Sequence, residues 1–315
     1  MRFFIKNFVL PVVLALLLTL SLVSCDTGRD GDSGEISFTD ALGREVSVSR
    51  APERVAALIG SFADVWQLAG GKVCATADDA WEDFDLELEG AVDIGGAHSP
   101  SLELLIAAEP ELVLASASTA SNVDMCDTLE QMGIDVIYFD VDNFEDYLDM
   151  LDICTDITGR KDLYEKNGIK IKEKIDSIKA EFEDMELSEA DRTVLLLRAS
   201  AGRVKAKGSD GTILGEMLRD IGCVNIADSN AGLLETLSVE SVIEKDPRHI
   251  FVVTMGNDTD AARDALRQMM EENGAWSELS AVKEGRLHVM DRHLFNIKPN
   301  ARWSDAYEKL YETLK

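Results

Sequence analysis

Short apolar runs alternate with amphipathic stretches along most of this chain, and the alternation predicts its fold class. The amphipathic stretches repeat their apolar residues every three or four positions, as one face of a helix does. Strands that alternate with helices favour an α/β fold with parallel sheets, because parallel strands need crossover connections. The clearest predicted strands are residues 54–59, 111–115, 135–139, 193–197, 249–254 and 286–290.

Residues 161–183 have the pattern of one long amphipathic helix. Apolar side chains recur there at steps of four, three and four, and Gly159 suits the end of a preceding helix. At 1.5 Å per residue such a helix is roughly 35 Å long, about the width of a small domain. We predict a linker helix over residues 160–186, and a closing helix near the end of the chain whose core-facing stripe is Trp303, Ala306, Tyr307, Leu310 and Leu314.

The chain carries the same local pattern on both sides of this linker. Residues 101–114 and 238–251 align with Ser, Glu, Ile and Pro at equivalent positions. In each copy the serine caps a short helix, and the proline ends it and is expected to force an extended residue before itself. Two copies around one helix predict two Rossmann-like lobes, residues 36–159 and 187–315, each with a central parallel sheet. The ligand cleft is expected between the lobes, at the carboxyl ends of the strands.

The N-terminus has the pattern of an export signal. Arg2 and Lys6 precede an apolar run of signal-peptide length, which is short for a membrane helix. The run ends just before Cys25 and resembles the lipobox of bacterial lipoproteins, which implies cleavage after residue 24 and lipidation of Cys25. An ordinary secretory signal with an incidental cysteine is the alternative. Residues 25–35 are then the lipidated cysteine and a small, polar, acidic tether.

Charge and cysteine content exclude several partners. The chain has 31 basic and 59 acidic residues and a net charge of -28, so it repels nucleic acid. An anionic ligand would therefore need a local basic patch.

The cysteines after Cys25 form no CxxC pair and have no zinc-site spacing. We expect four buried thiols, and whether any two of them form a disulfide stays open: Cys74, Cys126, Cys154 and Cys223.

Three segments, in this order along the chain, resemble one family: residues 38–58, 92–116 and 211–228. The family is the ABC-transporter substrate-binding lipoproteins with a rigid helical backbone, which serve ferric siderophores, haem and cobalamin. The resemblance implies a monomeric binding protein, held by its lipid at the extracytoplasmic face of the cell membrane. It would deliver its ligand to an ABC permease dimer with ATPase subunits. It also implies that Glu103 and Glu240, which the repeat superposes, dock onto the permease. GxSxG, GxGxxG, GxxxxGK[ST] and HExxH are absent from the sequence, so no enzyme is indicated.

Basic residues gather after predicted strands of the second half. Arg198 ends one predicted strand and should point into the cleft, whereas Lys205 and Lys207 could equally pair with surface acids. Together with the cations near residue 300 they predict a patch for an anionic ligand. The candidate ligand-binding residues are Trp66, Trp81, His98, Arg198, His293, Lys298 and Arg302.

A ferric siderophore is the ligand that these residues fit best. Its iron is already coordinated, so it needs cations, hydrogen bonds and aromatic walls rather than a metal site or a resident cofactor. The alternatives are cobalamin or another cobamide, haem with His98 and His293 as iron ligands, and a tethered sensor that uses the same cleft. His249 and His288 lie inside predicted strands and are expected to be core or edge residues.

Overall fold

The computed structural model describes residues 34–256 and 258–315, and residues 34–315 form one compact unit with its own cores. The predicted signal peptide, Cys25 and nearly all of the tether lie outside the described residues. Glu35, placed in the tether, instead begins a hairpin of β1 (Glu35–Thr39) and β2 (Glu45–Ser49). None of the described helices combines the length and the apolar content that a membrane crossing requires.

The first lobe contains a five-stranded sheet in the order β5-β4-β3-β6-β7, with every pairing parallel. Its central strands are buried on both faces, which explains why they read as continuous apolar runs. The strands are β3 (Val55–Ala57), β4 (Val73–Thr76), β5 (Val92–Asp93), β6 (Leu112–Ser116) and β7 (Asp135–Phe139). The helices are α1 (Gly60–Leu68), α2 (Asp79–Glu82), α3 (Leu102–Ala107), α4 (Ala120–Val123) and α5 (Cys126–Gln131).

The second lobe has a parallel sheet in the order β10-β8-β11-β12, and β9 pairs with β8 antiparallel. The antiparallel hairpin was not predicted, because β8 continues three residues past the expected end at residue 197. The strands are β8 (Thr193–Ser200), β9 (Arg203–Lys207), β10 (Val224–Asn225), β11 (His249–Thr254) and β12 (Leu287–Val289). The helices are α9 (Ile213–Asp220), α10 (Ala231–Glu235), α11 (Val239–Lys245), α12 (Thr259–Glu272), a 3₁₀ turn (Gly274–Glu278) and α13 (Ser280–Lys283).

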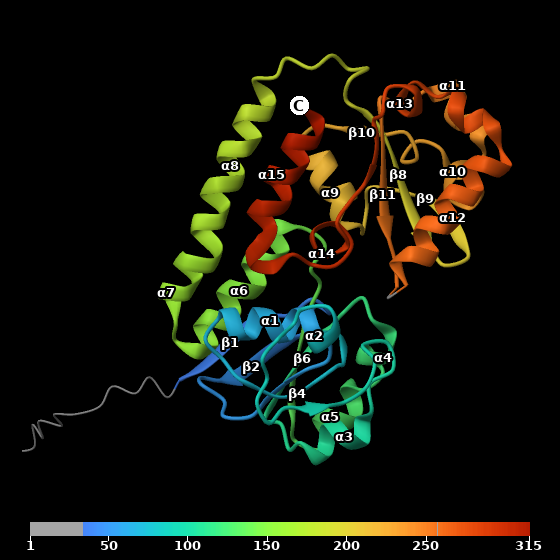
Figure 1. Cartoon of the computed structure of the whole chain (residues 1–315). Helices are drawn as coiled ribbons and strands as arrows, with labels where there is room; N and C mark the ends of the chain where they lie inside the picture. Colours follow the sequence, from blue (N-terminus) through green and yellow to red (C-terminus); the bar gives the residue numbers. More distant parts are fainter. Residues whose placement is uncertain (1–33, 257) are drawn as a thin grey trace, which may run out of the picture. The chain divides into compact units, whose positions relative to one another are not determined.

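The linker is one continuous helical run, as predicted, and it follows α6 (Phe144–Thr158), which ends at Gly159 with φ 69°. It consists of α7 (Lys161–Tyr164), a π-helical turn (Glu165–Ile169) and α8 (Lys170–Glu183), drawn together in Figure 1. The π turn is fixed from both sides. The Asn167 amide donates to the Leu68 carbonyl at 2.8 Å, and the Tyr147 hydroxyl donates to the Asn167 carbonyl at 2.8 Å. A π turn is rare and usually occurs as a single-turn bulge inside an α-helical run, as it does here.

One hydrophobic core joins the two lobes. It includes strands of both sheets together with α6, α8 and the last helix, α15 (Trp303–Leu314). The predicted stripe from Trp303 to Leu314 is buried, and α15 lies beside α8 (Figure 1). Between β12 and α15 lie α14 (Arg292–Phe295) and a 3₁₀ turn (Asn300–Arg302). Because this core is shared, relative movement of the lobes would have to shear packed side chains.

The internal repeat is present in three dimensions, with one correction. Ser101 and Ser238 cap α3 and α11, and each hydroxyl accepts the N–H three residues later. The residues before the prolines, Glu109 and Asp246, have φ of 48° and 38°, so they are left-handed and the predicted extended conformation is wrong. A following proline disfavours the right-handed helical region for the residue before it. Glu109 and Asp246 both adopt the left-handed region instead of the extended one.

Candidate functional site

A cavity between the lobes lies at the carboxyl ends of β11 and β12 of the second sheet and is closed on the other side by α2 of the first lobe. This cavity has a volume of about 560 Å³, and its walls come from both halves of the chain. Glu82 and Asp83, at the end of α2, form the first-lobe wall. Thr254 at the end of β11 and residues 290–293 after β12 form much of the second-lobe wall. The cavity therefore lies between the lobes and at the carboxyl ends of second-lobe strands, as predicted, but the first lobe borders it with a helix end and not with strand ends.

The β8–β9 hairpin places four cations on one face of the second sheet. Lys205 lies opposite Arg198, and Arg203 and Lys207 occupy matching positions on either side of that pair, so all four side chains alternate to the same face. This face also carries Leu196 of the shared core. Arg198 was expected at the end of its strand, but it lies within β8, which continues to Ser200. Its neighbour Ala199 pairs with Thr254 of the cleft wall.

The cations of this hairpin have no acidic partner among the described residues. Arg198 is half-buried, its Nε is buried without a hydrogen-bond partner, and burial lowers the pKa of its guanidinium. Burial and the charges of Arg198 and Lys205 lower the pKa of Lys207. Elsewhere in the second lobe cations commonly sit beside a carboxylate, as Arg219 and Arg248 do. A desolvated, self-repelling group of cations favours binding of an anion.

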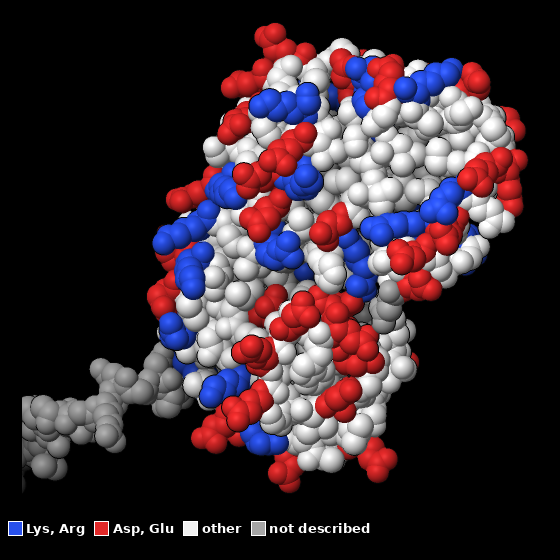
Figure 2. Space-filling view, viewed as in Figure 1, with Lys and Arg blue, Asp and Glu red and all other residues white. Residues whose placement is uncertain are grey.

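The first-lobe wall is acidic (Figure 2). The Gly60 N–H donates to Asp79 Oδ1 at 2.8 Å, and burial, with help from Asp83, raises the pKa of Asp79 from 3.8 to about 6. Burial also lowers the pKa of Lys298, while the nearby Asp142 and Asp140 raise it. Lys298 is half-buried and has carboxylates nearby, which Arg198 does not, so it is a weaker anion-binding candidate than Arg198.

An ion pair crosses the cleft, and it was not foreseen. The two terminal nitrogens of Arg292 lie 2.6 and 2.8 Å from the two carboxylate oxygens of Asp83, and each side chain is 14% exposed. His293 Nδ1 lies 3.1 Å from the Asp83 carbonyl oxygen. His293 is therefore at the cleft as predicted, but one ring nitrogen is already engaged by the first lobe.

Asn300 forms a second link between the lobes. It is 1% exposed with a left-handed φ of 51°, and its amide donates to the Ser61 carbonyl at 2.9 Å and to Asp64 Oδ2 at 2.8 Å. Asn tolerates left-handed φ better than most side chains do. The turn before α15 is thereby fixed to α1.

The remaining candidates divide into core and surface positions. Trp66 is 1% exposed and its indole N–H donates to the Lys72 carbonyl at 3.0 Å, so its predicted role as a ligand wall is wrong. Trp81 is half-buried on α2, and His98 is exposed in the loop after β5. Arg302 is exposed and lies 3.9 Å from an oxygen of Asp305. Trp81, His98 and Arg302 stay predictions.

His249 and His288 are strand residues away from the cleft, as predicted. Their rings stack, and His249 Nδ1 lies 3.1 Å from His288 Nε2. His249 is the first residue of β11, so the pair lies at the amino end of that strand. Burial and the neighbouring His288 lower the pKa of His249 to about 4. Both rings are therefore neutral at pH 7.

Glu103 and Glu240 are exposed in the first turns of α3 and α11. A backbone N–H and the Ser238 hydroxyl, 2.8 Å away, lower the pKa of Glu240, so its charge is stabilised. Their docking role stays a prediction.

The four described cysteines are free, but Cys74 and Cys126 are half-buried, so the prediction that all four are buried was wrong.

Comparisons with known proteins agree with this architecture. A family model described as periplasmic binding protein matches residues 55–294. The putative ABC transporter substrate-binding lipoprotein YhfQ of Bacillus subtilis is 23% identical and covers 95% of this chain and 94% of its own length. The Fe(3+)-citrate-binding protein YfmC of Bacillus subtilis is 25% identical, covering 91% of this chain and 90% of its own.

The fold also matches solved structures. Staphylococcus aureus SirA complexed with staphyloferrin B superposes with a TM-score of 0.68 at 21% identity, over 89% of this chain and 98% of SirA. The family model spans both sheets and the linker helix between them. The chain therefore belongs to the periplasmic binding protein family, whose model and ABC-transporter relatives identify it as a substrate-binding protein rather than an enzyme.

Proposed function

We propose that this protein captures an anionic ferric siderophore in the inter-lobe cleft and delivers it to an ABC permease with its ATPase subunits. The protein acts outside the cytoplasmic membrane, anchored by lipid on Cys25. The lipoprotein names of its relatives support the anchor. The observation that carries the ligand proposal is the β8–β9 cation cluster, since Arg198 and its neighbours lack acidic partners among the described residues.

Charge distribution supports this ligand class over the others. In a chain of net charge -28, a cation cluster left without carboxylates favours a ligand that brings its own negative charge. Relatives point the same way, because YfmC is named for Fe(3+)-citrate and SirA is complexed with staphyloferrin B. Neutral cobalamin would leave the cations unpaired. Haem would bring two propionates, but iron ligation by His293 would have to use the nitrogen that does not face Asp83.

A ligand panel tests the proposal. Residues 34–315 are titrated with ferric citrate, a ferric hydroxamate siderophore, haemin and cyanocobalamin, and unfolding is followed by heat. A ligand at 100 times its dissociation constant adds about 2.7 kcal/mol to the free energy of unfolding. We expect this stabilisation from an anionic ferric chelate and none from cyanocobalamin. Stabilisation by haemin or cyanocobalamin alone would overturn the siderophore proposal.

Delivery is tested separately from capture. Replacing both Glu103 and Glu240 with Lys reverses the charge of the two proposed docking points, which are exposed and far from the cleft cations in sequence. Uptake by cells should fail, while the affinity of the purified protein for its ligand should not change. Normal uptake by the double variant would rule out these residues as docking points.

A further inference from the structure

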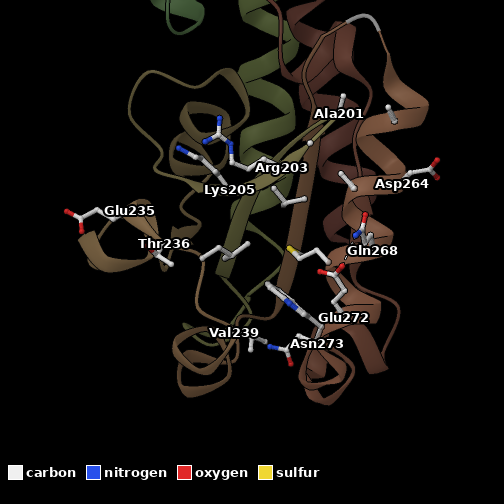
Figure 3. Close-up of a pocket in the computed structure, with 17 residues that line it drawn as sticks. Ala201, Arg203, Lys205, Glu235, Thr236, Val239, Asp264, Gln268, Glu272 and Asn273 are labelled. Atoms are coloured by element: carbon white, nitrogen blue, oxygen red, sulfur yellow. Dashed lines mark hydrogen bonds between the residues drawn. The ribbon is translucent and has the colours of Figure 1, made fainter.

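The Asp83–Arg292 ion pair joins the two walls of the inter-lobe cavity, and both of its residues line that cavity of about 560 Å³. A larger cavity of about 790 Å³ lies within the second lobe and is lined only by residues 201–276. There, Gln268 Nε2 donates to Glu272 Oε1 at 2.6 Å within one helix, α12 (Figure 3). An anion that enters the inter-lobe cavity therefore meets a guanidinium that already holds a carboxylate from the opposite wall.

Asp83 occupies Arg292 as the carboxylate of a ligand would. The two terminal nitrogens of Arg292 lie 2.6 and 2.8 Å from the two carboxylate oxygens, which is the fork geometry by which arginine recognises carboxylates in general. The Nε of Arg292 is buried without a hydrogen-bond partner, so Asp83 leaves one donor of the guanidinium unused. A ligand with several carboxylate oxygens has acceptors for the fork and for this remaining donor.

The Asp83 carboxylate can leave its partner without separating the lobes. The main chain of Asp83 is held independently of the side chain, because its N–H donates to the Asp79 carbonyl at 2.9 Å and its carbonyl oxygen lies 3.1 Å from His293 Nδ1. The amide of Asn300 forms a further link between the lobes. Residues 83–91 contain neither helix nor strand, so a change of side-chain rotamer is enough to release the carboxylate.

Arg263 brings a second positive charge to the same cavity. It lines the cavity from α12, and its acidic partner Asp260 lies 3.5 Å away with both side chains mostly exposed. An exposed pair of this kind contributes little and is easily given up. Two arginines of the second lobe thus line the cavity, one held by Asp83 and one paired only weakly.

We propose that Asp83 is an internal competitor of the ligand: its carboxylate holds Arg292 in the ligand-free protein, and a carboxylate of the chelate takes its place on binding. The inference rests on the proposed function, and it narrows the ligand to ferric chelates that present a carboxylate oxygen not bound to iron. In the exchange one charge-assisted pair breaks and another forms, while Asp83 turns toward solvent. The affinity for the chelate is then reduced in proportion to the fraction of molecules in which Arg292 is free.

The test is the dissociation constant of ferric citrate and of iron-free citrate for residues 34–315, by calorimetry, in the wild type and three variants. If Asp83 holds Arg292 in about nine-tenths of the molecules, Asp83→Asn binds both anions about tenfold more tightly than the wild type. Arg292→Ala binds both about tenfold more weakly, because it loses the contact itself. Glu82→Gln is the matched control, since it removes the same charge from an exposed residue of the same wall, and it should change the affinity less than about threefold.

The sign of the Asp83→Asn effect decides the inference, because a purely structural ion pair predicts equal or weaker binding in this variant. Asp83→Ser also frees Arg292 and should show the same gain, so a folding defect in one variant does not decide the result. Ferric citrate binding that neither Asp83 variant strengthens beyond Glu82→Gln would overturn the inference and leave the proposed function standing.

The iron-free arm separates the inference from the proposed function. The expected opposite effects of Asp83→Asn and Arg292→Ala on iron-free citrate, with no binding of ferric citrate, would support the exchange and count against the siderophore proposal. A wild type and an Asp83→Asn variant that bind neither anion would overturn both.

Discussion

The acidic residues of the first-lobe wall have partners, whereas the cations of the β8–β9 hairpin in the second lobe have no acidic partner among the described residues. Asp83 holds Arg292 with two short hydrogen bonds, and Asp79 accepts a backbone N–H. Arg198 of β8 has its Nε buried without a hydrogen-bond partner. A folded protein leaves a desolvated cation unpaired at a cost in stability, and such costs concentrate at binding sites. The difference supports a structural role for the Asp83–Arg292 pair and agrees with the proposal that the β8–β9 cations bind the ligand.

Breaking the cross-lobe ion pair should have the largest effect on stability. Arg292→Ala leaves the half-buried carboxylate of Asp83 without its partner, which is expected to lower the free energy of unfolding by about 3 kcal/mol. The measurement is urea unfolding of residues 34–315 at pH 7. Arg302→Ala is the control, because its exposed pair at 3.9 Å should contribute less than about 1 kcal/mol. Equal effects of the two variants would contradict a structural role for the Arg292–Asp83 pair.

The acidic wall should also make stability depend on pH through Asp79. Its folded pKa of about 6 exceeds the ordinary 3.8, so the folded state binds the proton more tightly and ionisation of Asp79 destabilises the fold. That contribution lowers stability as pH rises from about 4 to 6. Asp79→Asn keeps an oxygen for the Gly60 N–H and removes the charge, so it should add about 1–2 kcal/mol at pH 7, a figure reduced for partial solvent exposure.

The Asp79→Asn difference should disappear below about pH 4, where both forms are neutral. Unfolding curves at pH 4, 5, 6 and 7 measure it. A variant that is less stable than the wild type at pH 7 would show that the Asp79 charge is favourably held, for example by Lys298, and would contradict the unfavourable burial that its raised pKa indicates.

The β8–β9 cations give a smaller stability effect, whose sign is opposite to that of Arg292→Ala. Arg198→Met keeps the apolar stem and removes the buried, unpaired guanidinium, so the ligand-free protein should gain up to about 1 kcal/mol. Lys283→Met, which removes an exposed cation paired with Glu278, is the control and should change little. A clear loss of stability in Arg198→Met would mean that Arg198 supports the fold and is not reserved for a ligand.

Much of the fold follows from local patterns in the sequence. The period of Ile175, Ile178 and Phe182 identified the buried face of the linker, and the stripe of Trp303 and Tyr307 identified the packing of α15. These predictions succeeded because helix periodicity and burial are set by neighbours within a few turns. Apolar runs likewise identified β3, β6, β7, β8, β11 and β12, whereas β4, β5 and β10 were not among the predicted strands.

The cleft was harder to predict, because its contacts join residues far apart in sequence. Asp83 and Arg292 are 209 positions apart, and nothing in either neighbourhood signals the other. Trp66 was predicted at the ligand wall but lies in the core. The orientation of α1 decides which of its residues meet the cleft. That orientation depends on close tertiary packing, such as that of Gly60 against Ala80. The β9 hairpin, which leaves Lys205 and Lys207 without acidic partners among the described residues, is likewise a tertiary feature.

The measurement that tests the account most directly is the dissociation constant of ferric citrate for residues 34–315, by calorimetry, in the wild type, Arg198→Ala and Arg302→Ala. If the unpaired cations of the β8–β9 hairpin hold the anionic chelate, Arg198→Ala weakens binding at least about tenfold, the loss of one charge-assisted contact. Arg302→Ala, whose side chain is exposed beside Asp305, stays within about twofold of the wild type. An Arg198→Ala variant that binds ferric citrate as tightly as the wild type would contradict the account.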